Sequence, residues 1–329
     1  MNFSLEGSPH RSPGFSIMEL LVAVTILSII TMVTVSVMDH TSSLWRRSSA
    51  NIESFQSARI GFDLITRELS QATLNTYLDY DNPNNPVHYR RRSDLQFVCG
   101  PAGVNSLPGT PNTGCAVFFQ APVSYTTRTN LAVLEGSLNT CGFFVSFGAD
   151  PSIPSFAPTK QSYRYRLMNL IVPTENNGIY ANTNSASNSF GWFNNYVAQS
   201  TFPVAENVIA LVIRPEAPDN PMQFGGLEYN SLTKWTDYPQ PNSANQLPPI
   251  LNVSMVAIDE RSALRIENGA TAPSAISGAL QNFQSLLESK PQDIAGALDS
   301  LSSALTANKI NHRVFSSKVP LRESKWTKQ

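Results

Sequence analysis

The sequence predicts an α+β fold. A long N-terminal helix, first membrane-spanning and then amphipathic, packs on antiparallel sheets, and a pair of antiparallel helices is inserted near the C-terminus. Three observations lead to this prediction. A long apolar run lies near the N-terminus, at residues 15–38. The middle of the chain consists of short apolar or alternating segments bounded by Gly, Pro and Asn, and helical spacing returns at residues 273–307.

The apolar run covers residues 15–38, and Glu19 is the only ionisable side chain within it. A helix of this length would extend over about 36 Å, which is enough to cross the hydrocarbon core of a bilayer. A helix is favoured over a strand there because lipid offers the backbone no hydrogen-bond partners. We therefore expect a transmembrane helix. A cleaved secretory signal is less favoured, because its apolar core would be shorter and would precede a small-residue cleavage site.

Glu19 needs an explanation, because a carboxylate within a membrane segment costs free energy and usually serves a function. Its place near the start of the helix lowers that cost, since the positive end of the helix dipole is close to it. A plain signal anchor would leave the carboxylate without a role.

The motif GFSIME, residues 14–19, follows a short polar leader and opens the apolar run. This combination resembles the type IV prepilin processing signature. The resemblance implies that residues 1–14 are a leader peptide and that a prepilin peptidase cleaves between Gly14 and Phe15 on the cytoplasmic side. It also implies N-methylation of the new amino terminus at Phe15.

Cleavage at this position would give Glu19 a partner. The amine of Phe15 and the carboxylate of Glu19 would lie four residues apart on one helical face. In a bundle of such helices, Glu19 of one copy can pair with the Phe15 amine of a neighbour, so that neither charge is buried alone. We interpret Glu19 as an assembly residue.

An amphipathic stripe follows the apolar run. Its members recur at intervals of three or four residues: Phe55, Ala58, Phe62, Ile65, Leu69 and Ala72. This spacing predicts that the same helix continues outside the membrane over residues 39–76, with its regular part reaching about Leu74 and its stripe packed on a sheet. From Phe15 such a helix would be roughly 90 Å long.

Residues 77–329 are expected to form a β-rich domain. Its beginning, 79–86, is interpreted as a turn-rich linker, in which Pro83 interrupts the ligand spacing that a calcium loop would need. The predicted strands are 94–99, 116–120, 142–148, 163–172, 207–215, 250–259 and 313–321. Tyr alternates with Arg at 163–167, which predicts a half-buried strand with a basic outer face. Two apolar stripes at helical spacing predict a helical insertion at 273–307.

Several segments resemble the J-type minor pseudopilins of type II secretion: FDLITRELSQA at 62–72, NVIALVIRP at 207–215 and LPPILNVSMVAIDE at 247–260. With YRYRLM at 163–168 and VPLRESKW at 319–326, the chain looks closer still to a verrucomicrobial group of prepilin-type proteins, Verru_Chthon cassette protein C.

The resemblance implies a minor structural subunit with a single pass through the inner membrane, a cytoplasmic N-terminus before cleavage and a periplasmic C-terminal domain. Assembly through the N-terminal helix would build a periplasmic filament or tip complex of a type II secretion-like or type IV pilus-like machine. The implied partners are other pseudopilins or pilins, the prepilin peptidase, an assembly platform and inner-membrane lipid. The alternative is a binding or adhesin module on the same anchor, with loops such as 175–192 contacting the ligand.

The three cysteines all lie in the middle of the chain and form no C-x-x-C pair. Outside the cytoplasm, a disulfide between Cys99 and Cys115 would close a Gly/Pro-rich loop and remove about 3 kcal/mol of unfolded-chain entropy. The alternative is buried or free thiols. The sequence does not say which two of the three, with Cys141 included, would pair.

The sequence contains no catalytic constellation. The four histidines lack metal-ligand spacing, and the G-x-S-x-G, Walker A and G-x-G-x-x-G motifs are absent. The formal net charge is −1 and neither half of the chain has a basic run that would attract nucleic acid, which argues against nucleic-acid binding. We expect a protein without enzymatic activity, cofactor or metal.

Overall fold

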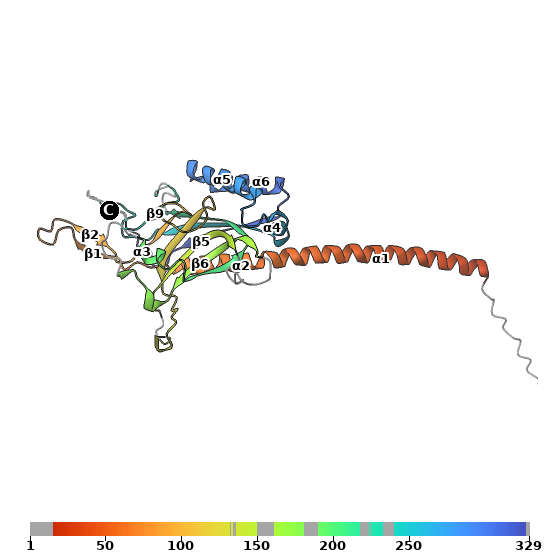
Figure 1. Cartoon of the computed structure of the whole chain (residues 1–329), viewed down its shortest axis with the longest axis horizontal. Helices are drawn as coiled ribbons and strands as arrows, with labels where there is room; N and C mark the ends of the chain where they lie inside the picture. Colours follow the sequence, from red (N-terminus) through yellow and green to blue (C-terminus); the bar gives the residue numbers. More distant parts are fainter. Residues whose placement is uncertain are drawn as a thin grey trace, which may run out of the picture. The chain divides into compact units, whose positions relative to one another are not determined.

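The computed structural model describes residues 16–131, 133, 136–149, 161–180, 190–217, 224, 226–232 and 240–326, without the side chains of residues 39, 40 and 42–54. The chain divides into two compact units, Met1–Glu53 and Ser54–Gln329. The predicted α+β class is confirmed, because a long apolar N-terminal helix is followed by sheets whose neighbouring strands, in the described residues, are antiparallel (Figure 1).

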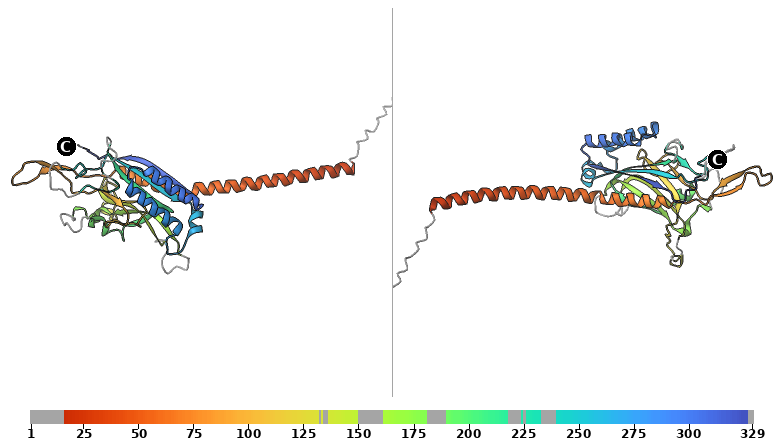
Figure 2. Two further views of the ribbon diagram at one scale, coloured as in Figure 1. Left: turned by 90° about the horizontal axis from the view of Figure 1, so that it is seen from above. Right: turned by 180° about the vertical axis from the view of Figure 1, so that it is seen from behind.

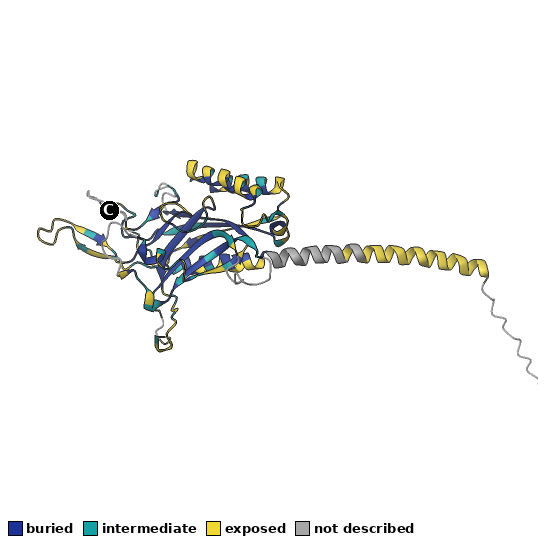
Figure 3. Cartoon of the chain, in the orientation of Figure 1, coloured by how far each residue is buried: buried dark blue, intermediate teal, exposed yellow. Residues whose placement is uncertain are grey.

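The predicted continuous helix over residues 15–76 is two helices. Helix α1 spans Ile17–Ser54, and α2 spans Gln56–Ser70. Phe55 separates them with a φ of −102° and a ψ of 0°, outside helical geometry. The part of α1 from Ile17 to Met38 is exposed along its whole length (Figure 3).

Helix α2 ends earlier than predicted because the chain turns to join a sheet. The backbone amides of Gln71 and Ala72 donate to carbonyls three residues back, which tightens the last turn. The next amide, that of Thr73, donates to the carbonyl of Gln120 at 2.9 Å. The predicted apolar stripe is nevertheless the buried face of α2.

A six-stranded sheet forms the centre of the second unit. Its strand order is β7 (Thr201–Glu206), β6 (Tyr163–Val172), β5 (Asn139–Ala149), β4 (Cys115–Ala121), β3 (Val98–Pro101) and β9 (Tyr229–Asn230). Both edge strands are poor templates for an additional strand, because β7 contains Pro203 and β9 has only two residues.

A three-stranded sheet packs against the larger one. Its strand order is β11 (His312–Pro320), β10 (Ile250–Ile258) and β8 (Val208–Glu216). Strand β8 is buried throughout and contacts β4, β5 and β6 of the larger sheet. Helix α2 contacts the edge strands β7 and β11 and contributes Phe62, Ile65 and Leu69 to the same core.

The predicted helical insertion at 273–307 consists of α5 (Ser274–Ser289) and α6 (Ile294–Ala307), preceded by the short α4 (Glu260–Ile266). Figures 1 and 2 show α5 and α6 side by side over the three-stranded sheet. Leu280 and Phe283, on the inner face of α5, are buried, whereas the outer surface of both helices is exposed (Figure 3). The Asp293 carboxylate caps α6 by accepting a hydrogen bond from the Gly296 amide at 2.9 Å.

The linker predicted at 79–86 lies within a separate two-stranded hairpin, formed by β1 (Tyr77–Tyr80) and β2 (Tyr89–Arg92). Its turn is organised by Asp81. Hydrogen bonds from the backbone amides of Val87, His88 and Asn82 to its carboxylate lower the pKa of Asp81 to about 2.

The second face of the six-stranded sheet carries a smaller core, covered by the segment around α3 (Gly191–Asn194). The ring of Phe193 stacks on that of Phe118, with centroids 3.9 Å apart. Gly142 on β5 makes room for this pair, because a Cβ at that position would overlap the Phe118 ring. Two short 3-10 helices, η1 (Thr129–Leu131) and η2 (Thr174–Asn176), lie in the connections.

The arginines of β6, predicted to form a basic outer face, are not freely solvated: Arg166 is buried and Arg164 is half-buried. Arg166 donates to the Gly148 carbonyl at 2.9 Å and pairs with Glu206 of β7 at 3.3 Å. Arg164 pairs with Glu260 at 2.7 Å. Strand β6 is an interior strand whose two faces are both covered, so each cation there needs an acceptor within the protein.

Candidate functional site

The predicted assembly residue, Glu19, lies in the first turn of α1. It is the only ionisable side chain of Ile17–Met38, a segment of 22 residues that is long and apolar enough to span a membrane. At about 1.5 Å per residue this segment covers about 33 Å. Glu19 is exposed, and within the part of the chain that the structure describes its carboxylate has no hydrogen-bond or salt-bridge partner.

Four hydroxyl groups of the same segment behave differently from Glu19. The side chains of Thr25, Ser28, Thr31 and Thr34 donate to helix carbonyls three or four residues earlier, at 2.8, 2.7, 2.8 and 2.8 Å. Such bonds let a hydroxyl enter lipid without an external partner. A carboxylate accepts hydrogen bonds and cannot be satisfied by helix carbonyls, so Glu19 needs a donor from elsewhere.

The predicted processing residues, Gly14 and Phe15, lie outside the described residues. The pairing of Glu19 with a Phe15 amine therefore stays a prediction. What the structure contributes is the helix on which Glu19 lies and the exposure of its segment Ile17–Met38.

The three cysteines are free, buried thiols on neighbouring strands β3, β4 and β5. Burial raises the pKa of all three, to about 12 for Cys115. The candidate bridge between Cys99 and Cys115 is not formed. In the antiparallel register Cys99 lies opposite Val117 and Cys115 lies opposite Pro101, so the two thiols are diagonal neighbours.

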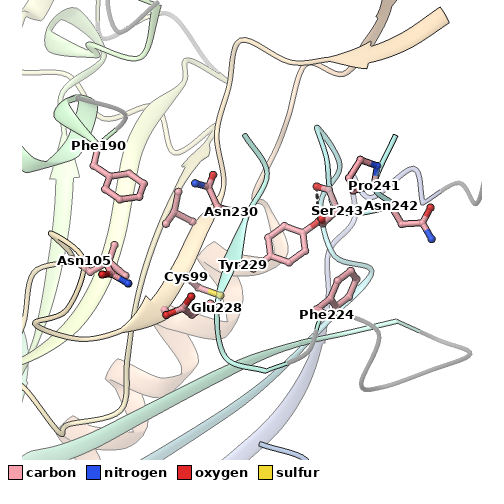
Figure 4. Close-up of a pocket in the computed structure, with 13 residues that line it drawn as sticks. Cys99, Asn105, Phe190, Phe224, Glu228, Tyr229, Asn230, Pro241, Asn242 and Ser243 are labelled. Atoms are coloured by element: carbon pink, nitrogen blue, oxygen red, sulfur yellow. Dashed lines mark hydrogen bonds between the residues drawn. The ribbon is translucent and has the colours of Figure 1, made fainter. Parts of the chain in front are cut away.

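A cavity of about 670 Å³ lies beside β3 and β9, at the β9 edge of the six-stranded sheet (Figure 4). Its volume is within the roughly 300–1,000 Å³ range of small-molecule sites. Asn105 and Phe190 lie on one side of it, and Phe224 and residues 241–243 lie on the other. Asn230 and Glu228 lie between the two sides.

Hydrogen bonds from the smaller core fix the side chain of Asn230, which lines this cavity. The side-chain oxygen of Asn230 accepts from the amide of Gln96 at 2.8 Å, and the oxygen of Gln96 accepts from the indole N–H of Trp192 at 2.7 Å. Gln96 and Trp192 are buried, so the orientation of the Asn230 amide is set before any ligand arrives.

Tyr229 holds in place the side of the cavity that is formed by Phe224 and residues 241–243. Its hydroxyl donates to the carbonyl of Gln246 at 2.8 Å and to that of Ser243 at 3.3 Å. Its ring contacts that of Phe224 edge-on, with centroids 5.1 Å apart. Burial raises the pKa of the Tyr229 hydroxyl, which therefore stays protonated and keeps donating.

Glu228 is the one charged group among the described lining residues. Its side chain is exposed, and no described residue forms a salt bridge or hydrogen bond with its carboxylate. Asn105, on the same side of the cavity as Phe190, has a φ of 51°, a left-handed conformation that asparagine tolerates better than most residues. The cavity therefore combines aromatic rings with neutral amides and one unpaired carboxylate.

Sequence reasoning did not find this cavity, because its residues come from several separate segments between 98 and 243 and form no motif. The one signal was the loop 175–192, expected to contact a ligand under the alternative hypothesis. Its residue Phe190 lines the cavity, and its residues 181–189 lie outside the described part of the chain.

Among the described residues, no group of three or more His, Cys, Asp or Glu side chains could hold a metal ion. Comparison of the chain with models of protein families, with curated proteins and with solved structures finds no match.

Proposed function

We propose that this chain is a minor pseudopilin, a structural subunit processed after Gly14 and assembled through its N-terminal helix. The assembly would be a periplasmic filament or tip complex of a type II secretion-like or type IV pilus-like machine. Its partners would be other pseudopilins or pilins, the prepilin peptidase, an assembly platform and inner-membrane lipid.

The observation that carries this proposal is the position of Glu19. A single carboxylate, the last residue of the processing motif, stands in the first turn of the apolar segment Ile17–Met38. An exposed apolar helix followed by antiparallel sheets is loosely pilin-like and supports the same proposal. Removal of residues 1–14 would supply the missing donor, because the new amine is cationic.

The first test is the intact mass of the full chain recovered from membranes of a host that has a prepilin peptidase. We expect a protein that begins at Phe15 and carries one additional methyl group. In the variant Gly14→Leu we expect the precursor to accumulate, because the cleavage site is blocked. A wild-type protein that begins at Met1 would refute the proposed processing.

The second test is the variant Glu19→Val, which should be processed normally but should enter assemblies at least about tenfold less efficiently. The reason is that the Phe15 amine of a neighbouring copy would be left buried without its partner. Incorporation is measured by cross-linking of copies in the membrane. The matched control is Ser28→Val, which also replaces a polar side chain of α1 by valine but removes no charge; equal incorporation of both variants would contradict charge pairing.

A second candidate function is a binding or adhesin module displayed on the same anchor. The observation in its favour is the cavity beside β9, with its unpaired Glu228 and aromatic sides. The two functions differ in what the second unit of the chain contacts: sister subunits in the first case and a ligand in the second.

A further inference from the structure

We infer that the cavity beside β9 is a binding site for a neutral oligosaccharide. This inference goes beyond the proposed assembly function and does not depend on it. The cavity lies entirely within the second unit, Ser54–Gln329, whereas the proposed assembly element is α1.

The first step of the argument is the aromatic content. Phe190 and Phe224 lie on opposite sides of the cavity, and neither is buried completely (Figure 4). Each is held by another aromatic ring: Phe190 by Phe193, with centroids 5.5 Å apart, and Phe224 by Trp326, at 5.3 Å. Such fixed ring faces bind the apolar C–H face of a sugar ring, and they lose little conformational freedom on binding.

The second step is the kind of polar group present. The residues that line the cavity include three with side-chain amides, Asn105, Asn230 and Asn242, together with Ser243 and Glu228. Amides and hydroxyls both donate and accept hydrogen bonds, and a carboxylate accepts two or more. A sugar hydroxyl also donates and accepts, so a polyhydroxylated ligand matches this set.

The third step concerns charge. No lysine or arginine is found among the described residues that line the cavity, and the one charge is that of Glu228. A phosphate, nucleotide or acidic peptide would meet an unpaired carboxylate and no cation, which is unfavourable. A cationic ligand would use the carboxylate and the rings but would offer no acceptor to the amide N–H groups of the lining residues. A neutral sugar satisfies all of these groups.

The fourth step is size and preorganisation. A volume of about 670 Å³ is larger than a single sugar ring needs and suits a short oligosaccharide. The Trp192–Gln96–Asn230 chain of hydrogen bonds and the bonds of Tyr229 fix both sides in advance. Binding therefore requires little reorganisation of the protein.

The test uses the full chain in a polyoxyethylene detergent, because glucoside and maltoside detergents carry sugars that would compete. Maltotriose, cellotriose, xylotriose, mannotriose and chitotriose are each titrated at millimolar concentration. Saturation-transfer NMR detects contact with sugar ring protons, and calorimetry gives the Kd. We expect saturable binding of at least one of these trisaccharides.

Two variants locate the binding. Phe190→Leu keeps an apolar side chain but removes the ring, and should weaken binding roughly threefold to tenfold. Glu228→Gln keeps the shape and removes the charge, and should weaken it about tenfold or more. The matched controls are Phe202→Leu on the opposite edge strand β7 and Glu323→Gln near the C-terminus, both exposed and outside the lining set. Thermal melting confirms that all four variants are folded.

The inference is overturned if none of the five trisaccharides binds, if binding is unaffected by both cavity variants, or if spermidine binds in their place. These outcomes are distinguishable from failure of the assembly proposal, because the mass of the N-terminus and the behaviour of Glu19→Val are read without any sugar.

Discussion

Glu68 is a carboxylate enclosed by apolar surroundings on the buried face of α2. Only 5% of its surface is exposed, and its Oε2 atom has no hydrogen-bond partner in the described residues. Burial raises the pKa of Glu68 to about 7, although the neighbouring Arg67 acts in the opposite direction. Between pH 4.5 and about 7, the folded chain therefore retains a proton on Glu68 that the unfolded chain has already released.

This pKa predicts a pH-dependent loss of stability. Because the folded pKa lies above the ordinary value of 4.5, the free energy of unfolding falls as the pH rises from about 4.5 to about 7 and then levels off. Glu68→Gln removes the charge, so it should be more stable than the wild type at pH 8, by up to about 3 kcal/mol, and nearly equal to it at pH 4.

Denaturant unfolding of the full chain at both pH values, followed by tryptophan fluorescence, measures the effect of Glu68→Gln. Asp299→Asn on the exposed side of α6 is the control and should change stability equally little at both pH values. If the free energy of unfolding changes equally with pH in the wild type and in Glu68→Gln, Glu68 does not titrate in this range.

At the scale of elements, a buried arginine adds hydrogen bonds to the apolar packing that holds the helical insertion on the three-stranded sheet. Arg214 of β8 donates to the carbonyls of Pro291 and Gln292, between α5 and α6, at 2.8 and 3.1 Å, and it also pairs with Glu216. Glu216 in turn accepts from Lys318 at 2.9 Å and from Asn252 at 3.2 Å.

The pKa of Glu216 reflects this network. Burial alone would raise it, but the hydrogen bonds from Arg214, Lys318 and Asn252 outweigh burial and lower it. A lowered carboxyl pKa contributes stability above the ordinary value of 4.5, and this contribution is lost as the pH falls below that value. The attachment of the helical insertion is therefore expected to be sensitive to acid.

Arg214→Met should destabilise the chain by about 3 kcal/mol, because it leaves Glu216 buried without its arginine and two carbonyls without their donor. The double variant Arg214→Met, Glu216→Met should recover part of the loss, since no charge is then buried alone. Thermal or denaturant unfolding measures both.

The matched control for Arg214→Met is Arg265→Met. Arg265 also donates to two carbonyls, those of Asn308 and Lys309, but these bonds are exposed. Its loss should cost less than about 1 kcal/mol. Equal losses for the two variants would show that burial of the Arg214–Glu216 pair is not what makes it important.

Long periodic elements were predictable from the sequence, and short ones were not. The stripe of α2, the helices α5 and α6 and strands such as 163–172 have enough residues for a period to be recognised. Strand β7 escaped prediction because Pro203 makes it look like a loop, and β9 is too short to show alternation. Both segments become strands only because they pair at the edges of the assembled sheet, where a proline is tolerated.

At the scale of the whole molecule, the sequence alone singles out Glu19 on α1, whose assembly role stays a prediction, but it does not indicate the cavity. The carboxylate of Glu19 is conspicuous in a run of apolar residues, so its chemistry can be recognised from one segment alone. The cavity depends on loops that come together only when β3, β9 and the segment around α3 are in place. No single segment of the sequence contains enough of its residues to indicate it.

The division into two units predicts that the fragment Ser54–Gln329 folds alone and stays soluble without detergent, whereas the full chain requires detergent. The reason is that Ile17–Met38 of α1 is apolar and exposed, whereas the fragment keeps α2 and the six-stranded and three-stranded sheets on which it packs. Size-exclusion chromatography and circular dichroism of the two proteins test this; aggregation of the fragment would show that it needs the first unit.

A shorter fragment that begins at Thr73 is the control. It lacks Phe62, Ile65 and Leu69 of α2, each of which is buried in the core. Loss of three such side chains removes roughly 5–9 kcal/mol, comparable to the whole stability of an ordinary domain. We expect this fragment to lose cooperative unfolding.

The edges of the six-stranded sheet would have a further consequence if Ile17–Met38 anchors many copies of the chain in one bilayer. Chains attached to one bilayer diffuse in two dimensions and collide often, which favours cross-β stacking wherever a long strand edge is open. A proline at one margin and a two-residue strand at the other leave little backbone for such stacking. Crowding on a bilayer is therefore not expected to convert this sheet into fibrils.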